Sequence, residues 1–395
     1  MTTKAKRWLL PDGVDEILPP RAWQLETLRR DILQLYNSWG YDLIKTPLIE
    51  FLDSLLVAPS HELQLSTFKM VDQLSGRSMG IRADISSQAA RIDAHVLQQN
   101  IPARYCYADS VLKTLPQGPL GSRSPQLVGA ELYGHSGMDS DFEVISLMLH
   151  TLETAGINNA LLTLGHSRIV RTILEMAQLE CGIHERLFTA LQNKATADIN
   201  LILAEAAPDP SLAELLRKLP ALHGDSSILD TALQMFGSAN EQLTAALKEL
   251  QAIAAAIASR FPDQTLYFDL CELRGYDYHT GLIFSAYVPD HGEAIANGGR
   301  YDAIGEAFGR SRAATGFDAD LKTLLKLGKR EYPLSRKIFA PATDDPALGE
   351  KISALRAAGE CVVQALKGQC EGAVEMGCNH QLVQEAGTWV LQDIG

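Results

Sequence analysis

The chain has 395 residues, of which 46% are hydrophobic and 21% charged, and its formal net charge is −13. A chain of this length can bury a sizeable core and typically divides into two or three domains. Nucleic-acid binding relies on Lys and Arg side chains that release counterions from phosphates, so the acidic balance disfavours a dedicated nucleic-acid binder.

The N-terminal residues and the cysteines are typical of a cytoplasmic protein. Pro11 and Asp12 interrupt the apolar run that a signal peptide needs, and no stretch approaches the length of a membrane span. The six cysteines are scattered and form no Cys-x-x-Cys pair, which favours reduced thiols. We therefore expect a cytoplasmic protein that does not associate with membranes.

The first predicted element is an amphipathic helix over residues 20–39, where apolar residues recur at helical spacing and Gly40 supplies a stop. Residues 41–51 predict an extended segment. Pro47 lacks an N–H for a strand ladder, so this segment suits a sheet edge or an interface.

A β-hairpin is predicted over residues 68–83, and Ser86 is expected to cap the helix that follows. Strands are predicted over residues 104–108 and 127–134. The stretch 115–125 between them is rich in Pro, Gly and Ser, so we expect a mobile loop there.

The second half begins with a helix after Asp139 and a strand over residues 160–164. Residues 167–260 are rich in Ala and Leu and predict an almost continuous helical insertion. Breaks in these helices are expected near Pro208, Pro220 and Gly237.

The last predicted elements of the main domain are strands over residues 265–270 and 282–288 and a helix over residues 318–327. The order predicts an α+β main domain over residues 1–328, with a mixed, mostly antiparallel sheet, flanking helices and the helical insertion. Residues 330–395 alternate strand and helix signals and predict a small α/β C-terminal domain.

The sequence contains no recognisable nucleotide-binding loop and no metal-binding motif. The sequence has neither a Walker-type phosphate loop nor a Gly-x-Gly-x-x-Gly between a strand and a helix, and no pair of His residues has zincin spacing. Cys370, Cys378 and His380 match the spacing of no zinc module. We therefore expect no metal and no cofactor.

Three segments do cluster polar and aromatic residues, at 81–86, 129–132 and 273–281. Glu131 lies on an otherwise apolar strand, where an unpaired buried carboxylate is expensive, so it is a candidate ligand for a positively charged group. The candidate site combines Asp84 and Glu131 for an ammonium, Arg274 for a carboxylate, and the hydroxyls of Tyr278 and Tyr301 for an imidazole. The alternative is that these residues form surface ion pairs at strand edges.

These segments resemble the histidyl-tRNA synthetase family of class II synthetases, in type and order, across about residues 8–328. Residues 12–20 are similar to the family's N-terminal signature, and residues 40–50 resemble motif 1, the dimer-forming helix and strand. Residues 274–278 (Arg-Gly-Tyr-Asp-Tyr) and 298–302 (Gly-Gly-Arg-Tyr-Asp) resemble the two histidine-specific signatures. The resemblance implies an antiparallel class II catalytic fold and a histidine pocket.

The sequence departs from the family at the two arginines that clamp ATP phosphates. Leu112 stands at the motif 2 position and Thr323 at the motif 3 position. Losing one donor of this kind typically costs on the order of a hundredfold or more in rate. Because both are lost, the resemblance implies no amino-acid activation and no catalytic residues. The tail is also short for the family's anticodon-binding domain, which argues against tRNA recognition.

A non-catalytic branch of this family has the same features: the regulatory subunits of ATP phosphoribosyltransferase. That resemblance implies a short-form catalytic subunit as partner, histidine as effector, and self-association through the motif 1 region into a hetero-octamer. Asp84 and Ser86 replace the family's Glu and Thr, and His279 replaces its second Tyr. The histidine-binding residues implied by the resemblance are Asp84, Ser86, Glu131, Arg274, Tyr278, His279 and Tyr301. The alternative is an amino-acid-activating ligase or a histidyl-tRNA synthetase-like enzyme.

Overall fold

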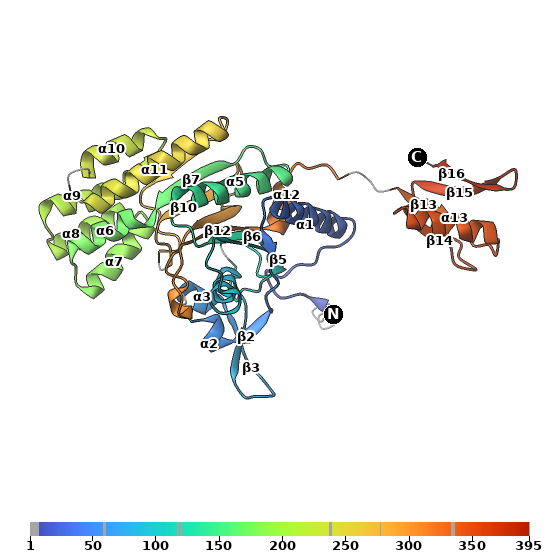
Figure 1. Ribbon diagram of the computed structural model, residues 1–395, viewed down its shortest axis with the longest axis horizontal. Coiled ribbons are helices and arrows are strands. Elements are labelled where there is room, and N and C mark those ends of the chain that lie inside the picture. Colours follow the sequence, from blue (N-terminus) through green and yellow to red (C-terminus); the bar gives the residue numbers. More distant parts are fainter. Residues whose placement is uncertain are drawn as a thin grey trace, which may run out of the picture. The chain divides into compact units, whose positions relative to one another are not determined.

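The computed structural model of the chain describes residues 8–57, 61–116, 118, 121–236, 239–276, 278–332 and 336–394. The chain divides into two compact units, Met1–Arg330 and Glu331–Gly395, and each has its own sheet (Figure 1). Some expected features lie outside the described residues: the helix break at Gly237, Asp277 of the first signature, and positions 117, 119 and 120 of the predicted loop.

A nine-stranded sheet forms the centre of the first unit, in the order β1-β5-β6-β12-β11-β10-β7-β9-β8. Two neighbouring pairs, β1 with β5 and β7 with β9, are parallel, and the other six are antiparallel. This confirms the predicted mixed, mostly antiparallel sheet. Its strands are β1 (Asp42–Leu43), β5 (Ala103–Ser110), β6 (Gln126–Tyr133), β7 (Leu161–His166), β8 (His223–Gly224), β9 (Leu266–Asp269), β10 (Leu282–Tyr287), β11 (Ala296–Arg300) and β12 (Ala314–Asp320).

The central strand β12 corrects the sequence prediction, which placed a helix from Asp318 onward. Helix α12 (Leu321–Leu327) begins only after the strand, and Asp320 caps it by accepting a bond from the Lys322 N–H at 3.3 Å. The strand contains small and polar residues and a single large apolar one, Phe317. Without alternating large side chains, it has no strand periodicity for a sequence pattern to detect.

Three helices pack on one face of this sheet: α1 (Arg21–Ser38), α5 (Met138–Thr154) and α11 (Glu241–Arg260) (Figure 1). Helix α1 buries Leu25, Leu28, Ile32 and Tyr36 along one stripe, as its spacing predicts. The Tyr36 ring meets that of Phe317 edge-on, with centroids 6.1 Å apart. Phe317 thus points toward the helices, and its neighbours Gly316 and Asp318 point to the opposite face.

The predicted helical insertion corresponds to a run of helices at the β7–β9 end of the sheet, at the left in Figure 1. It comprises α6 (Ser167–Ala177), α7 (Cys181–Gln192), α8 (Thr196–Ala206), α9 (Pro210–Lys218), η3 (Leu219–Ala221), α10 (Ser227–Phe236) and α11. Pro210 and Pro220 both lie in the first turn of their helices. A backbone N–H there has no partner within the helix, so proline, which lacks it, is tolerated.

A three-stranded sheet in the order β2-β4-β3 includes the predicted hairpin. Ser86 is the first residue of α4, whose N-cap is Ile85 without a side-chain cap, so the predicted capping role of Ser86 is wrong. Its hydroxyl bonds a carboxylate instead. The elements here are β2 (Ile49–Phe51), α2 (Leu52–Leu55), α3 (His61–Ser66), β3 (Phe68–Val71), β4 (Ser78–Ile81), α4 (Ser86–Arg91), η2 (Ile92–Leu97) and, later in the chain, η4 (Glu306–Phe308).

The second unit has a four-stranded sheet in the order β14-β13-β15-β16, with one helix packed on it. Its core contains Ile338, Leu348, Ile352 and Leu382. The elements are β13 (Lys337–Ala340), α13 (Pro346–Ala357), β14 (Cys361–Gln364), β15 (His380–Glu385) and β16 (Thr388–Asp393), of which β15 was not predicted. Across the described ranges of both units, no helix is long and apolar enough to cross a membrane.

Candidate functional site

On the face of the large sheet that is turned away from α1 and α5, two glycines on neighbouring strands, Gly316 and Gly299, lie in line with Glu131 and form a glycine strip. In register, Glu131 of β6 lies opposite Gly316 of β12, which lies opposite Gly299 of β11. A Cβ on Gly316 would collide with the Tyr301 hydroxyl and lie 2.6 Å from Glu131 Oε2, and one on Gly299 would lie 2.6 Å from His279 Nε2. The glycines therefore let polar side chains lie directly against the strands.

Glu131 is the most deeply buried carboxylate at this strip, with 1% of its surface exposed. Its Oε1 accepts bonds from the Ser86 hydroxyl at 2.6 Å and the Tyr107 hydroxyl at 3.2 Å, whereas Oε2 has no hydrogen-bond partner among the residues that the structure describes. Burial raises the pKa of Glu131 well above its usual range, and Asp84 and Asp318 add to the rise. A buried carboxylate oxygen without a hydrogen-bond partner is well suited to accept a bond from a ligand's N–H.

Two further carboxylates lie near Glu131. Asp84 Oδ1 accepts bonds from the backbone N–H groups of Ile85 at 2.6 Å and Ser86 at 3.1 Å, which fixes the turn before α4. Burial raises the pKa of Asp318 to about 7, with Asp84 contributing to the rise and Lys113 opposing it. Such mutual repulsion is relieved when a cation binds among the carboxylates.

The chemistry of these carboxylates fits an organic ammonium. No group of three or more His, Cys, Asp or Glu side chains in the part of the chain that the structure describes is arranged to hold a metal ion. An ammonium has three N–H donors to share among neighbouring carboxylate oxygens.

Arg274 provides the positive charge of the site. Its guanidinium donates to Ser285 Oγ at 2.9 Å, to Tyr287 Oη at 2.9 Å and to Asn297 Oδ1. These bonds use three of the five N–H donors of a guanidinium, so two stay available to an anion. Asn297 lies directly opposite Asp318 on the next strand. Positive and negative groups thus meet on neighbouring strands, an arrangement that suits a zwitterion.

The imidazole of His279 lies between these two charged ends and is neutral. Its Nδ1 is 3.0 Å from the backbone oxygen of Arg274, which can only accept, so Nδ1 carries the proton and Nε2 is an acceptor. Burial lowers the pKa of His279 to about 4. The centroids of the Tyr278 and Tyr301 rings are 4.4 and 6.4 Å from that of His279. The buried hydroxyl of Tyr301 has no hydrogen-bond partner within the described part of the chain.

The structure places all the sequence-predicted residues on one face of the sheet or on the turns beside it: Asp84, Ser86, Glu131, Arg274, Tyr278, His279 and Tyr301. Tyr107, Asp318 and Asn297 also belong to this site and were not predicted from the sequence. The alternation of tyrosines along β5 gave a signal for Tyr107, whereas Asp318 was hidden by its assignment to a helix. Asn297 joins the site only through strand pairing, which no local pattern reveals.

Neither position of the missing ATP-clamping arginines provides a cation. The Thr323 hydroxyl donates to Asp320 Oδ2 at 2.8 Å and so belongs to the start of α12. Leu112 donates its backbone N–H to the backbone oxygen of Arg82 at 3.1 Å. An apolar side chain and a hydroxyl engaged in a helix cap cannot neutralise a triphosphate.

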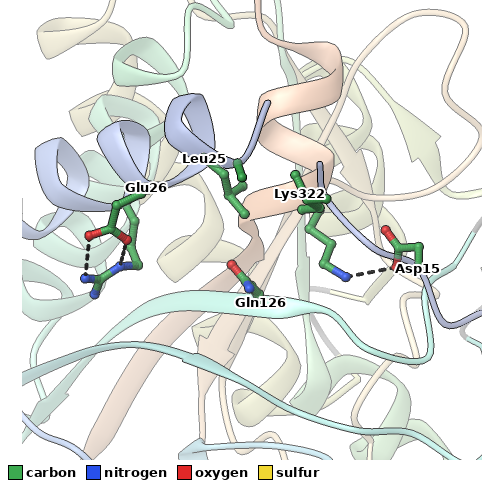
Figure 2. Close-up of a pocket in the computed structure, with 8 residues that line it drawn as sticks. Asp15, Leu25, Glu26, Gln126 and Lys322 are labelled. Atoms are coloured by element: carbon green, nitrogen blue, oxygen red, sulfur yellow. Dashed lines mark hydrogen bonds and ion pairs between the residues drawn. The ribbon is translucent and has the colours of Figure 1, made fainter. Parts of the chain in front are cut away.

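Two open hollows lie away from this site, beside α1, with volumes of about 320 and 240 Å³. Figure 2 shows the larger one between α1 and α12, where Lys322 points toward Asp15. The Lys322–Asp15 pair is 2.9 Å long and the Arg29–Glu26 pair 2.8 Å. These charges already neutralise one another, so the hollow is a poorer ligand site than the strip at Glu131.

The chain and its fold match known families. The histidyl-tRNA synthetase family model matches residues 13–324, and the model for the C-terminal domain of ATP phosphoribosyltransferase subunit HisZ matches residues 335–392. A solved ATP phosphoribosyltransferase regulatory subunit/histidyl-tRNA synthetase from Bacillus halodurans has a TM-score of 0.82 at 25% identity and covers 94% of this chain and 96% of that one. A histidyl-tRNA synthetase from a Nostoc species, at 17% identity, has a TM-score of 0.78 with 98% and 97% covered, which shows the shared fold.

Curated relatives match the chain almost end to end. ATP phosphoribosyltransferase regulatory subunits from Alkalilimnicola ehrlichii and Thioalkalivibrio sulfidiphilus are 49% and 48% identical, and each covers 99% of this chain with 98% and 100% of its own length. The regulatory subunit from Stutzerimonas stutzeri is 50% identical, with 98% of both chains covered. The resemblance and the class II fold predicted from the sequence are thus confirmed: the chain belongs to the family of ATP phosphoribosyltransferase regulatory subunits, which share the histidyl-tRNA synthetase fold.

Proposed function

We propose that this chain is a regulatory subunit without catalytic activity of its own. It activates the short-form catalytic subunit of ATP phosphoribosyltransferase, at the first step of histidine biosynthesis, and mediates feedback inhibition by histidine. One observation carries the proposal: the face of the sheet keeps a half-bonded buried Glu131 and an anchored Arg274, whereas the two phosphate-clamping positions are Leu112 and Thr323.

The proposed ligand is L-histidine, bound as a zwitterion. Its ammonium lies among Asp84, Glu131 and Asp318, and its carboxylate accepts the remaining N–H donors of Arg274. Ser86 holds Glu131 in place. The ligand's ring is lined by Tyr278, His279 and Tyr301, where the buried Tyr301 hydroxyl and His279 Nε2 offer one donor and one acceptor to an imidazole.

Inhibition by histidine requires a difference in affinity between two arrangements of the complex. Histidine must bind the inhibited arrangement more tightly than the active one, typically with about 1–3 kcal/mol of coupling. By the same linkage, the catalytic subunit must alter the affinity of this chain for histidine.

The distribution of exposed apolar side chains supports self-association through the motif 1 region. Of the 21 large apolar side chains that are exposed within the described ranges, 17 belong to residues 8–115. They include Trp23 on α1, Leu43 on the edge strand β1, and Leu74, which is 98% exposed at the hairpin tip. A surface region rich in exposed apolar side chains is typical of an interface. Copies paired there, together with the catalytic subunit, would form the proposed cytoplasmic hetero-octamer.

The deciding experiment measures the rate of the short-form catalytic subunit from the same genome, with and without this chain, while histidine is titrated into both. We expect marked activation and altered inhibition by histidine. An unchanged rate with no complex on sedimentation would overturn the proposal. Robust histidine-dependent exchange of pyrophosphate into ATP by this chain alone would also overturn it, in favour of an amino-acid-activating enzyme.

A further inference from the structure

The first two turns of α6 bind the backbone of the turn that carries three ligand-site residues. Arg168 Nε donates to the backbone oxygen of Thr280 at 3.0 Å, and Ser167 donates its N–H and hydroxyl to that of Gly281 at 2.9 and 3.1 Å. Arg171 donates to the backbone oxygens of Tyr276 at 2.7 Å and His279 at 3.3 Å. One helix of the helical insertion thus holds most of this turn.

Tyr276 is held by side chains from two helices of the insertion. The Arg171 guanidinium lies over its ring, 4.6 Å from the centroid, and the Phe188 ring of α7 lies 4.7 Å from it at 55°. A cation over an aromatic ring and a tilted ring pair are both attractive contacts. The guanidinium of Arg171 therefore contacts both the backbone of the turn and one of its side chains.

The same turn has little freedom to adjust on its own. Gly275 adopts a φ of +64°, and a Cβ there would lie 2.5 Å from His279 Nδ1. The His279 ring in turn bonds the backbone oxygen of Arg274. A displacement of the His279 carbonyl, to which Arg171 donates, would thus shift both the ring acceptor of His279 and the origin of the Arg274 side chain.

We propose that Arg171 is a positioning residue that couples α6 and α7 of the helical insertion to the ligand site through the 274–281 turn. The inference rests on the proposed function for the identity of the ligand. Arg171 touches no ligand. It holds the turn in the shape in which Arg274 and His279 face the glycine strip. By reciprocity, a bound amino acid stabilises the contact between the turn and these two helices.

The test compares Arg171→Met and Arg171→Lys with a matched control, Arg186→Met. Arg186 belongs to α7 but is exposed, and it pairs with Glu205 at 2.9 Å away from the turn. Two quantities are measured at one pH: the affinity for L-histidine by calorimetry, and amide hydrogen exchange of residues 274–281 without ligand. Melting temperatures show that each variant is folded.

We expect Arg171→Met to weaken L-histidine binding by about tenfold or more, Arg171→Lys to lie between, and Arg186→Met to match the wild type. Exchange should accelerate within the turn in Arg171→Met only, and L-histidine should slow exchange in α6 and α7 of the wild type. Unchanged affinity in Arg171→Met would overturn the inference.

The failure of the ligand assignment is distinguishable from the failure of this inference. If the wild type does not bind L-histidine, the proposed function fails, and exchange in the ligand-free proteins decides the positioning role. Acceleration confined to the turn in Arg171→Met supports that role, and identical exchange in wild type and variant overturns it. If Arg171→Met does not fold, the same two measurements on Arg171→Lys decide.

Discussion

Glu131 and Arg300 are both buried ionisable residues of the large sheet, yet they differ in how their polar atoms are satisfied. Glu131 leaves Oε2 without a partner and binds only two hydroxyls through Oε1. Arg300 engages all five of its N–H donors, with Asp141, Asp302 and Ser140 and with two backbone oxygens. The fully bonded guanidinium of Arg300 is suited to fixing the fold, and the unpartnered oxygen of Glu131, on the face that carries Arg274 and His279, is available to a ligand.

The contrast explains how one signature can hold two kinds of residue. Arg300 and Tyr301 are neighbours in the Gly-Gly-Arg-Tyr-Asp segment. The Arg300 side chain ties β11 to the start of α5, whereas the Tyr301 hydroxyl lies at the glycine strip without a partner. Hydrogen-bond satisfaction, rather than membership of a motif, separates the structural residue from the candidate binding residue.

The largest expected effect is the loss of stability on replacing Arg300. Arg300→Met leaves the Asp141 carboxylate buried without its cation, which typically costs about 3–5 kcal/mol. Urea unfolding of the variant and the wild type measures the difference. The double variant Arg300→Met/Asp141→Asn should recover part of the loss, because the buried charge of Asp141 is removed together with its cation, and only the partly exposed Asp302 loses its partner. A loss below about 1 kcal/mol would show that the network does not fix the fold.

Replacing Glu131 should separate binding from stability. Glu131→Gln keeps an oxygen that accepts from Ser86 and Tyr107 but loses the charge for the ligand's ammonium. We expect affinity for L-histidine to fall by about tenfold or more, with little change in the free energy of unfolding. Calorimetry and urea unfolding measure the two, and Glu153→Gln on the exposed side of α5 is the control. Equal affinity in both variants would remove Glu131 from the site.

The carboxylate cluster predicts a dependence of stability on pH through Asp318. Its pKa rises from an ordinary 3.8 to about 7 on folding, so the folded state binds more protons than the unfolded chain between these values. Stability contributed by this group is therefore present at low pH and is lost as pH rises through about 7. Asp318→Asn removes the titrating carboxyl group and therefore this loss of stability at higher pH.

We expect Asp318→Asn to gain stability relative to the wild type as pH rises from about 4 to 7, with no further gain above pH 8. Because the side chain is partly exposed, the gain should be about 1–2 kcal/mol rather than the full linkage value. Urea unfolding at several pH values checks it. A difference between the two proteins that stays constant with pH would show that Asp318 titrates normally.

The elements that the sequence predicted well are those with strong local periodicity. Helix α1 has four buried apolar residues on one stripe, and Gly40 follows it with a φ of +80°. Strand β12 escaped prediction because its environment, glycine strip on one face and helices on the other, exists only once the sheet has formed. The same holds within the site. Glu131 was conspicuous on an apolar strand, whereas Asn297 and Asp318 become neighbours only through pairing of β11 with β12.

The smallest expected effect comes from the hollow beside α1, which tests whether the glycine strip is the ligand site. Lys322→Met keeps most of the side-chain volume but breaks the pair with Asp15, which is half exposed, so stability should fall by no more than about 1 kcal/mol. Affinity for L-histidine should stay within twofold of the wild type by calorimetry, because Lys322 is already neutralised. A fall comparable to that of Glu131→Gln would mean that the hollow, with its Lys322–Asp15 pair, takes part in binding, and that the unpartnered oxygen of Glu131 alone does not mark the site.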